Sequence, residues 1–328
     1  MKKLRKVGII LGSIVATIAL FIGIVNLFPC YKVESTPFTK VDKPIISAHR
    51  GGAELNPENT EKAFDYVILE TNYTDAVEFD IRLTKDNVAV IIHDDYIDEY
   101  ALEVGLESEE KSQTVSIKDY TYEELLNYNL GRNFIDRDNN RPYVNLSIEE
   151  AKNEGLTLMT LDSFLNKYKE ARDFKIYLEI KDKKEPAIEL AKLVIELLNN
   201  DENSWWKERT MVISSDDKAI DYIANNDKTI YTGAVGMKIA GPIVTNIFKV
   251  DPFFKPNFHC AQTALTNKLG PIKVNSATKS FVKSVHKHNQ SICYWGVNTI
   301  EDMQKVIEIG ADAITTDAPD KLYNLINN

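Results

Sequence analysis

The chain has 328 residues, of which 44% are hydrophobic and 27% are charged, and its formal net charge is −10. This composition is ordinary for a soluble globular protein and supplies enough apolar residues for a large core. The acidic balance excludes a typical nucleic-acid-binding protein, because contacts with phosphates need clusters of Lys and Arg. Three cysteines are too few for a disulfide framework, and Cys260 and Cys293 are either bonded or buried as thiols. Nothing in the sequence indicates an obligate protein partner.

The first thirty residues differ from the rest of the chain. The start, MKKLRK, carries four positive charges and no acid, and residues 7–28 then form an uncharged, mostly apolar run of 22 residues. Such a run is long enough to span a bilayer. The apolar part of a cleaved signal peptide is usually ~7–15 residues long and ends at small residues, whereas this run leads into Pro29 and Cys30. We therefore predict that residues 1–30 form a basic cytoplasmic tip and an uncleaved transmembrane anchor.

The basic tip also predicts the orientation of the chain. Positive charges beside a membrane span stay in the cytoplasm, so the residues after Cys30 are expected outside the cell, as the extracytoplasmic part of a single-pass cell-membrane protein. Residues 31–43 are predicted as a linker and residues 44–328 as the folded domain. Subtracting the four positive charges of the tip from the total of −10 leaves −14 for the outward part. The proline before Cys30 fits a lipoprotein cleavage box poorly.

Short apolar, β-branched runs recur after the linker, and most gaps between them contain a stretch with helical periodicity. These predicted strands lie at 44–48, 75–81, 88–92, 174–180, 210–214, 229–235, 291–297 and 311–316. Eight strands with helical crossovers predict a parallel sheet, and the domain has the length of a (β/α)8 TIM barrel. Helix signals are clearest after Asn56 and Pro57, a candidate cap and first helical residue, and in 186–198.

Two stretches interrupt this alternation. Residues 94–157 begin with the polar and acidic sequence DDYIDEYALEVGLESEEK, which predicts a small insertion after the third strand. Residues 236–258 are apolar and aromatic but contain Pro242, Pro252 and Pro256, which predicts a long loop. Because this loop follows a strand, we expect it to overhang the carboxyl ends of the strands.

Polar side chains stand where four predicted strands end. His49 follows the first strand, Glu78 and Asp80 lie near the end of the second, and His93 follows the third. Glu179 and Lys181 end the fourth strand, and the two-residue period of a strand places both on one side. In a TIM barrel the carboxyl ends of the strands form the catalytic rim. We therefore predict that these side chains converge on one site.

The predicted site has a consistent chemistry. Three carboxylates without Cys or clustered His form an all-oxygen ligand set, which suits one divalent cation, Ca²⁺ or Mg²⁺, rather than zinc. Such a cation points to a phosphate substrate, which Arg50 and Lys181 would flank. His49 and His93 titrate near neutrality and are the candidate general base and general acid. Gly51 and Gly52 allow a tight turn or a close approach to a ligand.

Ordered motifs along the whole domain resemble those of the glycerophosphodiester phosphodiesterase family. They are His49-Arg50-Gly51, Pro57-Glu58-Asn59-Thr60, Glu78-x-Asp80, His93-Asp94, Glu179-x-Lys181, Trp295-Gly296-Val297-Asn298 and GADAITTDAP at 310–319. The resemblance implies roles for the polar residues: Glu78, Asp80 and Glu179 carry the metal, His49 accepts a proton, His93 donates one, and Arg50 and Lys181 contact phosphate. It also implies hydrolysis of a glycerophosphodiester to glycerol 3-phosphate and an alcohol.

Two departures from the family pattern bear on contacts with the leaving group. The family often has an arginine shortly after the histidine and aspartate of its fourth motif, but here the sequence continues DYIDEYA. The strand at 210–214 leads into Ser214-Ser215-Asp216, where Ser-Phe is usual in the family.

Three functional classes remain open. The first is an outward-facing hydrolase of soluble glycerophosphodiesters or of glycerophosphate-containing wall polymers. The second is a lipid-directed phosphodiesterase of lysophospholipase D type, which the anchor and the aromatic residues of 236–258 suggest. The third is a non-catalytic binding module on a barrel scaffold. Trp295 is interpreted as barrel core, with lining of the substrate pocket as the alternative.

Overall fold

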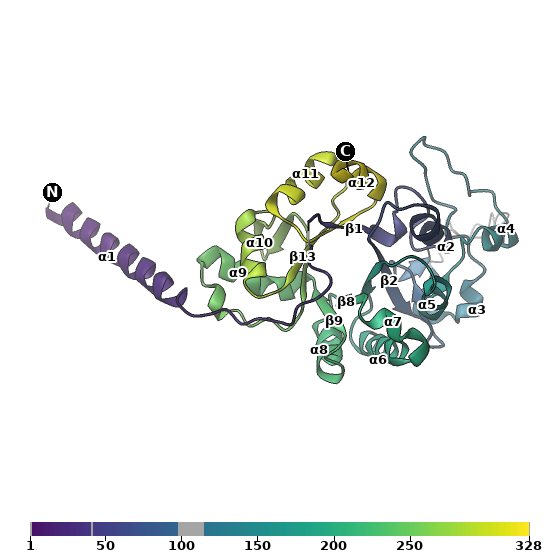
Figure 1. Cartoon of the computed structure of the whole chain (residues 1–328), viewed down its shortest axis with the longest axis horizontal. Coiled ribbons are helices and arrows are strands. Elements are labelled where there is room, and N and C mark those ends of the chain that lie inside the picture. Colours follow the sequence, from purple (N-terminus) through teal and green to yellow (C-terminus); the bar gives the residue numbers. More distant parts are fainter. Residues whose placement is uncertain (1, 41, 98–114, 328) are drawn as a thin grey trace.

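The structure, a computed structural model, describes residues 2–40, 42–97 and 115–327. Within these residues, eight parallel strands close a barrel, because β1 pairs with β14 on one side and with β2 on the other (Figure 1). The strands of the barrel are β1 (Ile45–Ala48), β2 (Ala76–Leu83), β7 (Lys175–Ile180), β8 (Thr210–Ser214), β9 (Tyr231–Ala234), β10 (Cys260–Thr263), β13 (Ser291–Trp295) and β14 (Ala313–Thr316). The predicted TIM barrel is therefore confirmed.

The number of barrel strands agrees with the prediction, but one strand was assigned wrongly. The run at 88–92 contains β3 (Ala89–Ile91), which pairs antiparallel with the far half of β2 and with β6 (Met159–Thr160), outside the barrel. The sixth barrel strand is instead β10, whose sequence CAQT is too short and too polar to stand out as a buried strand. The insertion therefore begins between the second and third barrel strands, after a hairpin.

Helices surround the barrel, and several short ones extend its connections. They are α2 (Glu61–Asp65), α5 (Leu161–Tyr168), α6 (Glu185–Asn199), α7 (Ser204–Lys207), α8 (Asp217–Asn226), α9 (Ala240–Phe248), α10 (Lys279–His286), α11 (Ile300–Ile309) and α12 (Pro319–Asn327). The predicted helix at 186–198 is confirmed as α6. The predicted start at Pro57 is wrong, because α2 begins at Glu61, where the side chain of Thr60 accepts the N–H of Ala63.

Apolar side chains fill the amino-terminal end of the barrel. Phe38 comes from the predicted linker and is fully buried, with its ring centroid 5.1 Å from that of Tyr177 on β7. The thiols of Cys260 and Cys293 belong to the same cluster and are not bonded to each other. Residues 31–40 contain no helix or strand, yet they cross the amino end of the barrel and close it with Phe38.

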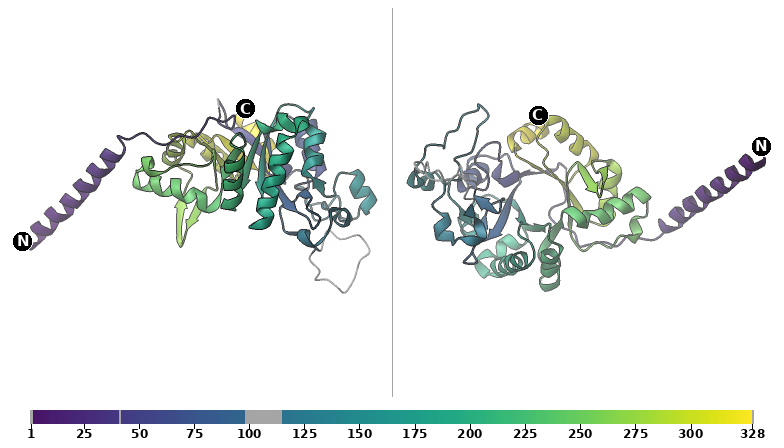
Figure 2. Two further views of the ribbon diagram at one scale, coloured as in Figure 1. Left: turned by 90° about the horizontal axis from the view of Figure 1, so that it is seen from below. Right: turned by 180° about the vertical axis from the view of Figure 1, so that it is seen from behind.

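The insertion is a small unit on the side of the barrel opposite α1 (Figure 2). Its described elements are β4 (Tyr96–Ile97), β5 (Val115–Ser116), α3 (Tyr122–Leu125) and α4 (Ile148–Asn153), and residues 98–114 of the predicted insertion lie outside the described residues. A separate apolar cluster around Val90 and Leu125 supports it. A second small hairpin, β11 (Thr266–Leu269) with β12 (Ile272–Asn275), follows β10.

The prediction that residues 236–258 form a long loop is wrong. They form a short helix at Gly236–Ile239, then α9, and then a turn of 3-10 helix at Asp251–Phe253. Pro242 lies in the first turn of α9, where its missing N–H removes no hydrogen bond. The segment does not overhang β2, because α9 lies beside α10 on the opposite side of the barrel (Figure 1).

One long apolar helix precedes the barrel. Helix α1 (Lys2–Val25) contains a stretch of 20 residues, Lys6–Val25, with a mean hydropathy of 2.6 and the length needed to cross a bilayer. By length and composition it is compatible with a membrane anchor or a signal sequence.

Candidate active site

The turn after β1 explains why the sequence His49-Arg50-Gly51-Gly52 follows a buried strand. Arg50, Gly51 and Gly52 all have positive φ, at 51°, 82° and 89°. A Cβ on Gly51 would lie 2.9 Å from the Cβ of Ala63, so only glycine fits there. The unusual conformation of Arg50 directs its backbone N–H to the Glu78 carboxylate, with an N–O distance of 3.0 Å. The turn therefore holds His49 and Arg50 against the carboxylates of β2.

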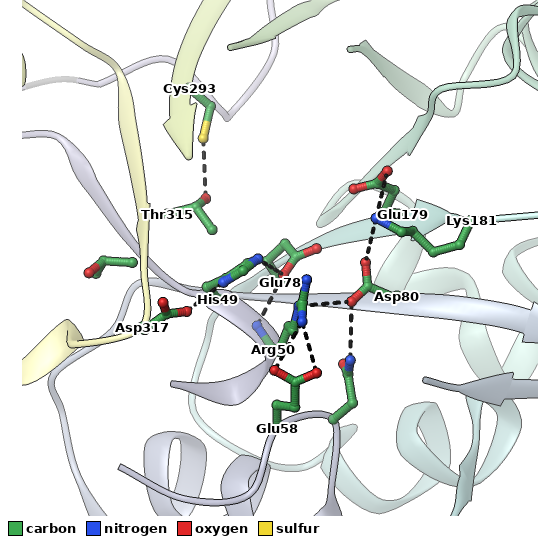
Figure 3. A network of polar contacts seen from close by, with 12 residues as sticks. His49, Arg50, Glu58, Glu78, Asp80, Glu179, Lys181, Cys293, Thr315 and Asp317 are labelled. Atoms are coloured by element: carbon green, nitrogen blue, oxygen red, sulfur yellow. Dashed lines mark hydrogen bonds and ion pairs between the residues drawn. The ribbon is translucent and has the colours of Figure 1, made fainter. Parts of the chain in front are cut away.

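Glu78, Asp80 and Glu179 form one cluster at the mouth of the barrel (Figure 3). Each residue offers a carboxylate oxygen, and the three oxygens lie within 4.8 Å of one another. Burial, and then the neighbouring charge of Asp80, raise the pKa of Glu78 to about 8. A divalent cation would relieve this repulsion, and an all-oxygen set is what Mg²⁺ and Ca²⁺ prefer. The residues present therefore fit a hard divalent cation.

Two basic side chains lie within this cluster. Nη1 of Arg50 donates to both carboxylate oxygens of Glu58, at 2.8 and 2.9 Å, and its Nε lies 3.4 Å from Asp80. Nζ of Lys181 lies 3.2 Å from Glu179 and 3.4 Å from Asp80. Both side chains offset part of the negative charge, and both stand where a phosphate bound at the carboxylates would meet them.

His49 is held by a residue that the sequence interpretation missed. Its Nδ1 lies 2.5 Å from Oδ1 of Asp317, and its Nε2 faces Glu78 at 3.9 Å (Figure 3). Burial lowers the pKa of His49, but the hydrogen bond to Asp317 and the charge of Glu78 outweigh it, so that the pKa is raised. Asp317 accepts a hydrogen bond from the side chain of Asn298. Asp317 follows β14 as His49 follows β1, and these two strands pair. This pairing is the feature that could have identified Asp317 as the partner of His49.

His93 reaches the site by a different route from the one predicted. It does not end a parallel barrel strand, because β3 runs antiparallel to β2 and so returns His93 towards Asp80. The backbone carbonyl of His93 accepts a hydrogen bond of 2.8 Å from Nε of Arg82, and its Nδ1 lies 2.7 Å from Asp94. The hairpin, in which the N–H of Ile92 donates to the carbonyl of Asp80 at 2.9 Å, therefore brings His93 close enough for its charge to act on Glu179.

A cavity of about 450 Å³ adjoins this histidine. Side chains from the turn after β1 and from the insertion line it together: Ala53, Pro57, Glu58, Asn59, Ile92, His93, Asp94, Tyr96, Ile97, Leu130, Asn133, Phe134 and Ile135. The cavity mixes apolar and polar groups, and it opens next to the proposed proton donor.

Trp295 is not part of the barrel core. Its side chain is 43% exposed at the end of β13, so the core interpretation is wrong and lining of the substrate pocket stays a prediction. Asp216, one of the departures from the family pattern, has a structural role. Its carboxylate accepts the backbone N–H groups of Lys184 and Lys218, at 2.7 and 2.9 Å, and so links two connections of the barrel.

Comparison with known proteins agrees with this geometry. Residues 49–321 match the model of the glycerophosphoryl diester phosphodiesterase family. A glycerophosphodiester phosphodiesterase of Bacillus altitudinis is 24% identical over 85% of this chain and 97% of its own. Another, from Caldanaerobacter subterraneus, is 28% identical over 87% of this chain and 98% of its own.

Solved structures share the fold. The glycerophosphoryl diester phosphodiesterase domain of a Mycobacterium tuberculosis protein has a TM-score of 0.65 at 16% identity, covering 87% of this chain and 100% of that domain. A phosphodiesterase of Oleispira antarctica, solved with the product sn-glycerol 3-phosphate, has a TM-score of 0.60 at 18% identity, covering 87% of this chain and 98% of its own. The chain thus belongs to the glycerophosphodiester phosphodiesterase family. It is an enzyme of that class rather than a non-catalytic binding module.

Proposed function

We propose that the chain is a metal-dependent phosphodiesterase, anchored in the cell membrane with its barrel outside, that releases glycerol 3-phosphate and an alcohol from glycerophosphodiesters. The observation that carries the proposal is the cluster of three carboxylates flanked by Arg50, Lys181 and two histidines. Such a cluster fits a cation and a phosphate together. The Oleispira antarctica phosphodiesterase with bound sn-glycerol 3-phosphate supports the proposed product.

Glu78, Asp80 and Glu179 would hold the Mg²⁺ or Ca²⁺ ion. When bound, the ion supplies positive charge that neutralises phosphate oxygens. Lys181, between Asp80 and Glu179, contributes a point charge to the phosphate, and Arg50 contributes a planar guanidinium that Glu58 keeps in position. The substrate phosphate would bind over the carboxylates with these two side chains at its sides.

His49 is the proposed general base. Its Nδ1 is engaged by Asp317, so Nε2 remains to accept a proton from the glycerol hydroxyl next to the phosphate. The hydroxyl oxygen then bonds to phosphorus, and the bond from phosphorus to the oxygen of the departing alcohol breaks. His93 donates a proton to that oxygen. Water then opens the cyclic phosphate and gives glycerol 3-phosphate.

The departing alcohol would occupy the cavity beside His93. The cavity is lined by this proposed proton donor and by Glu58, which holds Arg50 beside the carboxylates. Its mixed lining admits a polar alcohol of moderate size. A lipid-directed reaction of lysophospholipase D type is the second candidate, because α1 would keep the enzyme beside its lipid substrate.

The test is an assay of the full-length chain in detergent on glycerophosphocholine, lysophosphatidylcholine and polyglycerophosphate, with glycerol 3-phosphate and choline both quantified. Equal amounts of the two products from glycerophosphocholine support the proposal. Choline that forms from lysophosphatidylcholine but not from glycerophosphocholine supports the second candidate. Removal of metal by a chelator should abolish product formation, and added Mg²⁺ or Ca²⁺ should restore it. Undiminished activity after chelation contradicts the metal site.

The outward orientation is tested separately on intact cells. A protease added from outside should digest the barrel and leave a short embedded fragment that contains α1. Full-length chain in the soluble cytosolic fraction contradicts both the anchor and the orientation.

A further inference from the structure

A face of large apolar side chains is exposed on the side of the barrel next to α1. Val244, Ile247 and Phe248 on α9 are 41%, 48% and 63% exposed, and Phe253 in the following turn is 63% exposed. We call these four residues the apolar face. Isolated exposed apolar residues are common on soluble proteins, but a contiguous group marks a surface that contacts a partner or a membrane.

The apolar face is continuous with the end of α1. The rings of Phe21 on α1 and Phe253 lie 6.2 Å apart between centroids. Nδ2 of Asn26 donates to the backbone carbonyl of Lys249, directly after α9, at 2.7 Å. Val25, the last residue of α1, is only 4% exposed. Both views of Figure 2 show α1 leaving the molecule on the side of α9. A membrane that surrounds α1 would therefore reach the apolar face.

The charges around the apolar face differ from those of the whole chain. The domain is strongly acidic, yet within residues 236–257, all of which the structure describes, the sole acid is Asp251. Asp251 is buried and its carboxylate is paired with Nζ of Lys287 at 2.5 Å. Exposed lysines stand nearby instead: Lys249 and Lys255, and Lys279 and Lys283 on the adjoining α10. A basic rim around apolar residues is typical of segments that lie in a lipid surface.

We propose that the apolar face inserts into the headgroup region of the membrane that α1 spans, so that the barrel rests on an anionic lipid surface instead of standing free on a tether. The proposal rests on the membrane anchoring put forward above. Lys249 strengthens the arrangement, because its Nζ donates to the hydroxyl of Ser280 at 2.6 Å and so joins α9 to α10. Because α9 is joined to α10 in this way, lipid contact at α9 would hold the barrel itself and fix which side of the barrel faces the lipid.

The experiment measures lipid contact in the full-length chain. Phe248→Trp is reconstituted in vesicles of equal parts phosphatidylglycerol and phosphatidylcholine, with acyl chains brominated near the headgroup. The matched control is Leu69→Trp, an apolar residue that is 55% exposed outside the apolar face. Bromine quenches a tryptophan only in close contact, so we expect at least about twofold quenching of the tryptophan at 248, measured against the unsubstituted chain, and none at 69.

Three results would overturn the proposal. One is equal quenching at the two positions, and another is no quenching at 248. The third is quenching that disappears in nanodiscs holding one chain each, which assigns the apolar face to a second copy of the chain.

Extraction of the membranes at alkaline pH separates this proposal from the anchor: a chain that resists extraction without quenching at 248 refutes only the lipid contact. A chain that is washed off refutes the anchor. Unchanged hydrolysis of glycerophosphocholine by Phe248→Trp shows that the substituted barrel is folded.

Discussion

The two ends of the barrel use the same strands for opposite purposes. On β2, Ala76 belongs to the apolar cluster at the amino end, whereas Glu78 and Asp80 follow on the same face and belong to the site. On β7, Tyr177 packs against Phe38, and Glu179 two residues later joins the carboxylates. The change from core to site takes place within one step of the strand period. The amino end therefore stabilises the strands that hold the repelling charges of the other end in place.

The largest effect should come from a change in the carboxylate cluster. Glu78→Gln should lower activity by at least about a thousandfold, because a metal site supplies several kcal/mol of charge stabilisation. Metal binding, measured by isothermal titration calorimetry, should fall with it. The chelated variant should not melt below the chelated parent. Folding raises the pKa of Glu78 to about 8, so its ionised form is disfavoured in the folded state. The resulting loss of stability begins as pH rises above the pKa of Glu78 in the unfolded chain, and it is complete above pH 8.

If Glu78→Gln melts at a lower temperature than the parent in the presence of chelator, the distinction between a stabilising amino end and a destabilising site is wrong. Such a result would mean that this carboxylate supports the fold as Tyr177 does. The same measurement on Tyr177→Ala provides the contrast, since loss of a buried aromatic side chain should lower the melting temperature with or without metal.

Substrates with different leaving groups should distinguish the roles of the two histidines. His93→Ala should lose ~10²–10⁴-fold on glycerophosphocholine but much less on a p-nitrophenyl diester of glycerol, whose leaving group departs without a proton. His49→Ala should lose activity on both substrates, because the attacking hydroxyl needs its base in each case. The measurement compares both variants on both substrates at saturating metal.

Rescue by the nitrophenyl substrate in His49→Ala alone would reverse the two roles. Rescue in neither variant would show that the histidines position the substrate or the metal. Each variant must first be shown to bind the cation, because both imidazoles lie beside the carboxylates.

The amino end is tested by Phe38→Ala. Phe38 is fully buried, and such a truncation typically costs about 3–5 kcal/mol. Urea unfolding should show this loss, while kcat below the melting transition should stay within about twofold, because Phe38 packs at the opposite end of the strands from the carboxylates. A fall in kcat as large as that of His49→Ala would mean that the ends are coupled.

The sequence predicted the class of the fold and most of the rim, because polar residues at the ends of apolar runs are a strong local signal. It failed where the signal depends on packing between distant segments. The strand CAQT of β10 is buried by its neighbours β9 and β13, and not by its own pattern. Residues 88–92 have a strong strand pattern, but only the extended length of β2 shows that they pair antiparallel with it. Asp317 became visible as a partner of His49 only when β1 and β14 were paired.

The smallest expected effect concerns Asp317 and a second Asp–His pair, whose aspartates flank the same strand. Asp312 lies before β14, where it meets Nε2 of His286 at 2.7 Å, and Asp317 lies after β14, where it meets His49 at 2.5 Å. Asp317 raises the pKa of His49, and a general base acts only when it is neutral, so activity should fall as pH drops through that raised pKa. Asp317→Asn removes the charge, so the acidic limb of kcat/KM should move to lower pH, with a lower plateau because the imidazole is less firmly oriented. Asp312→Asn should lower the melting temperature, since the carboxylate of Asp312 also accepts the buried N–H of Ile292, but it should leave the acidic limb in place.

An acidic limb that shifts equally in both variants, or in neither, would show that Asp317 supports the fold at the mouth as Asp312 does at the other end, and that it does not set the proton affinity of His49.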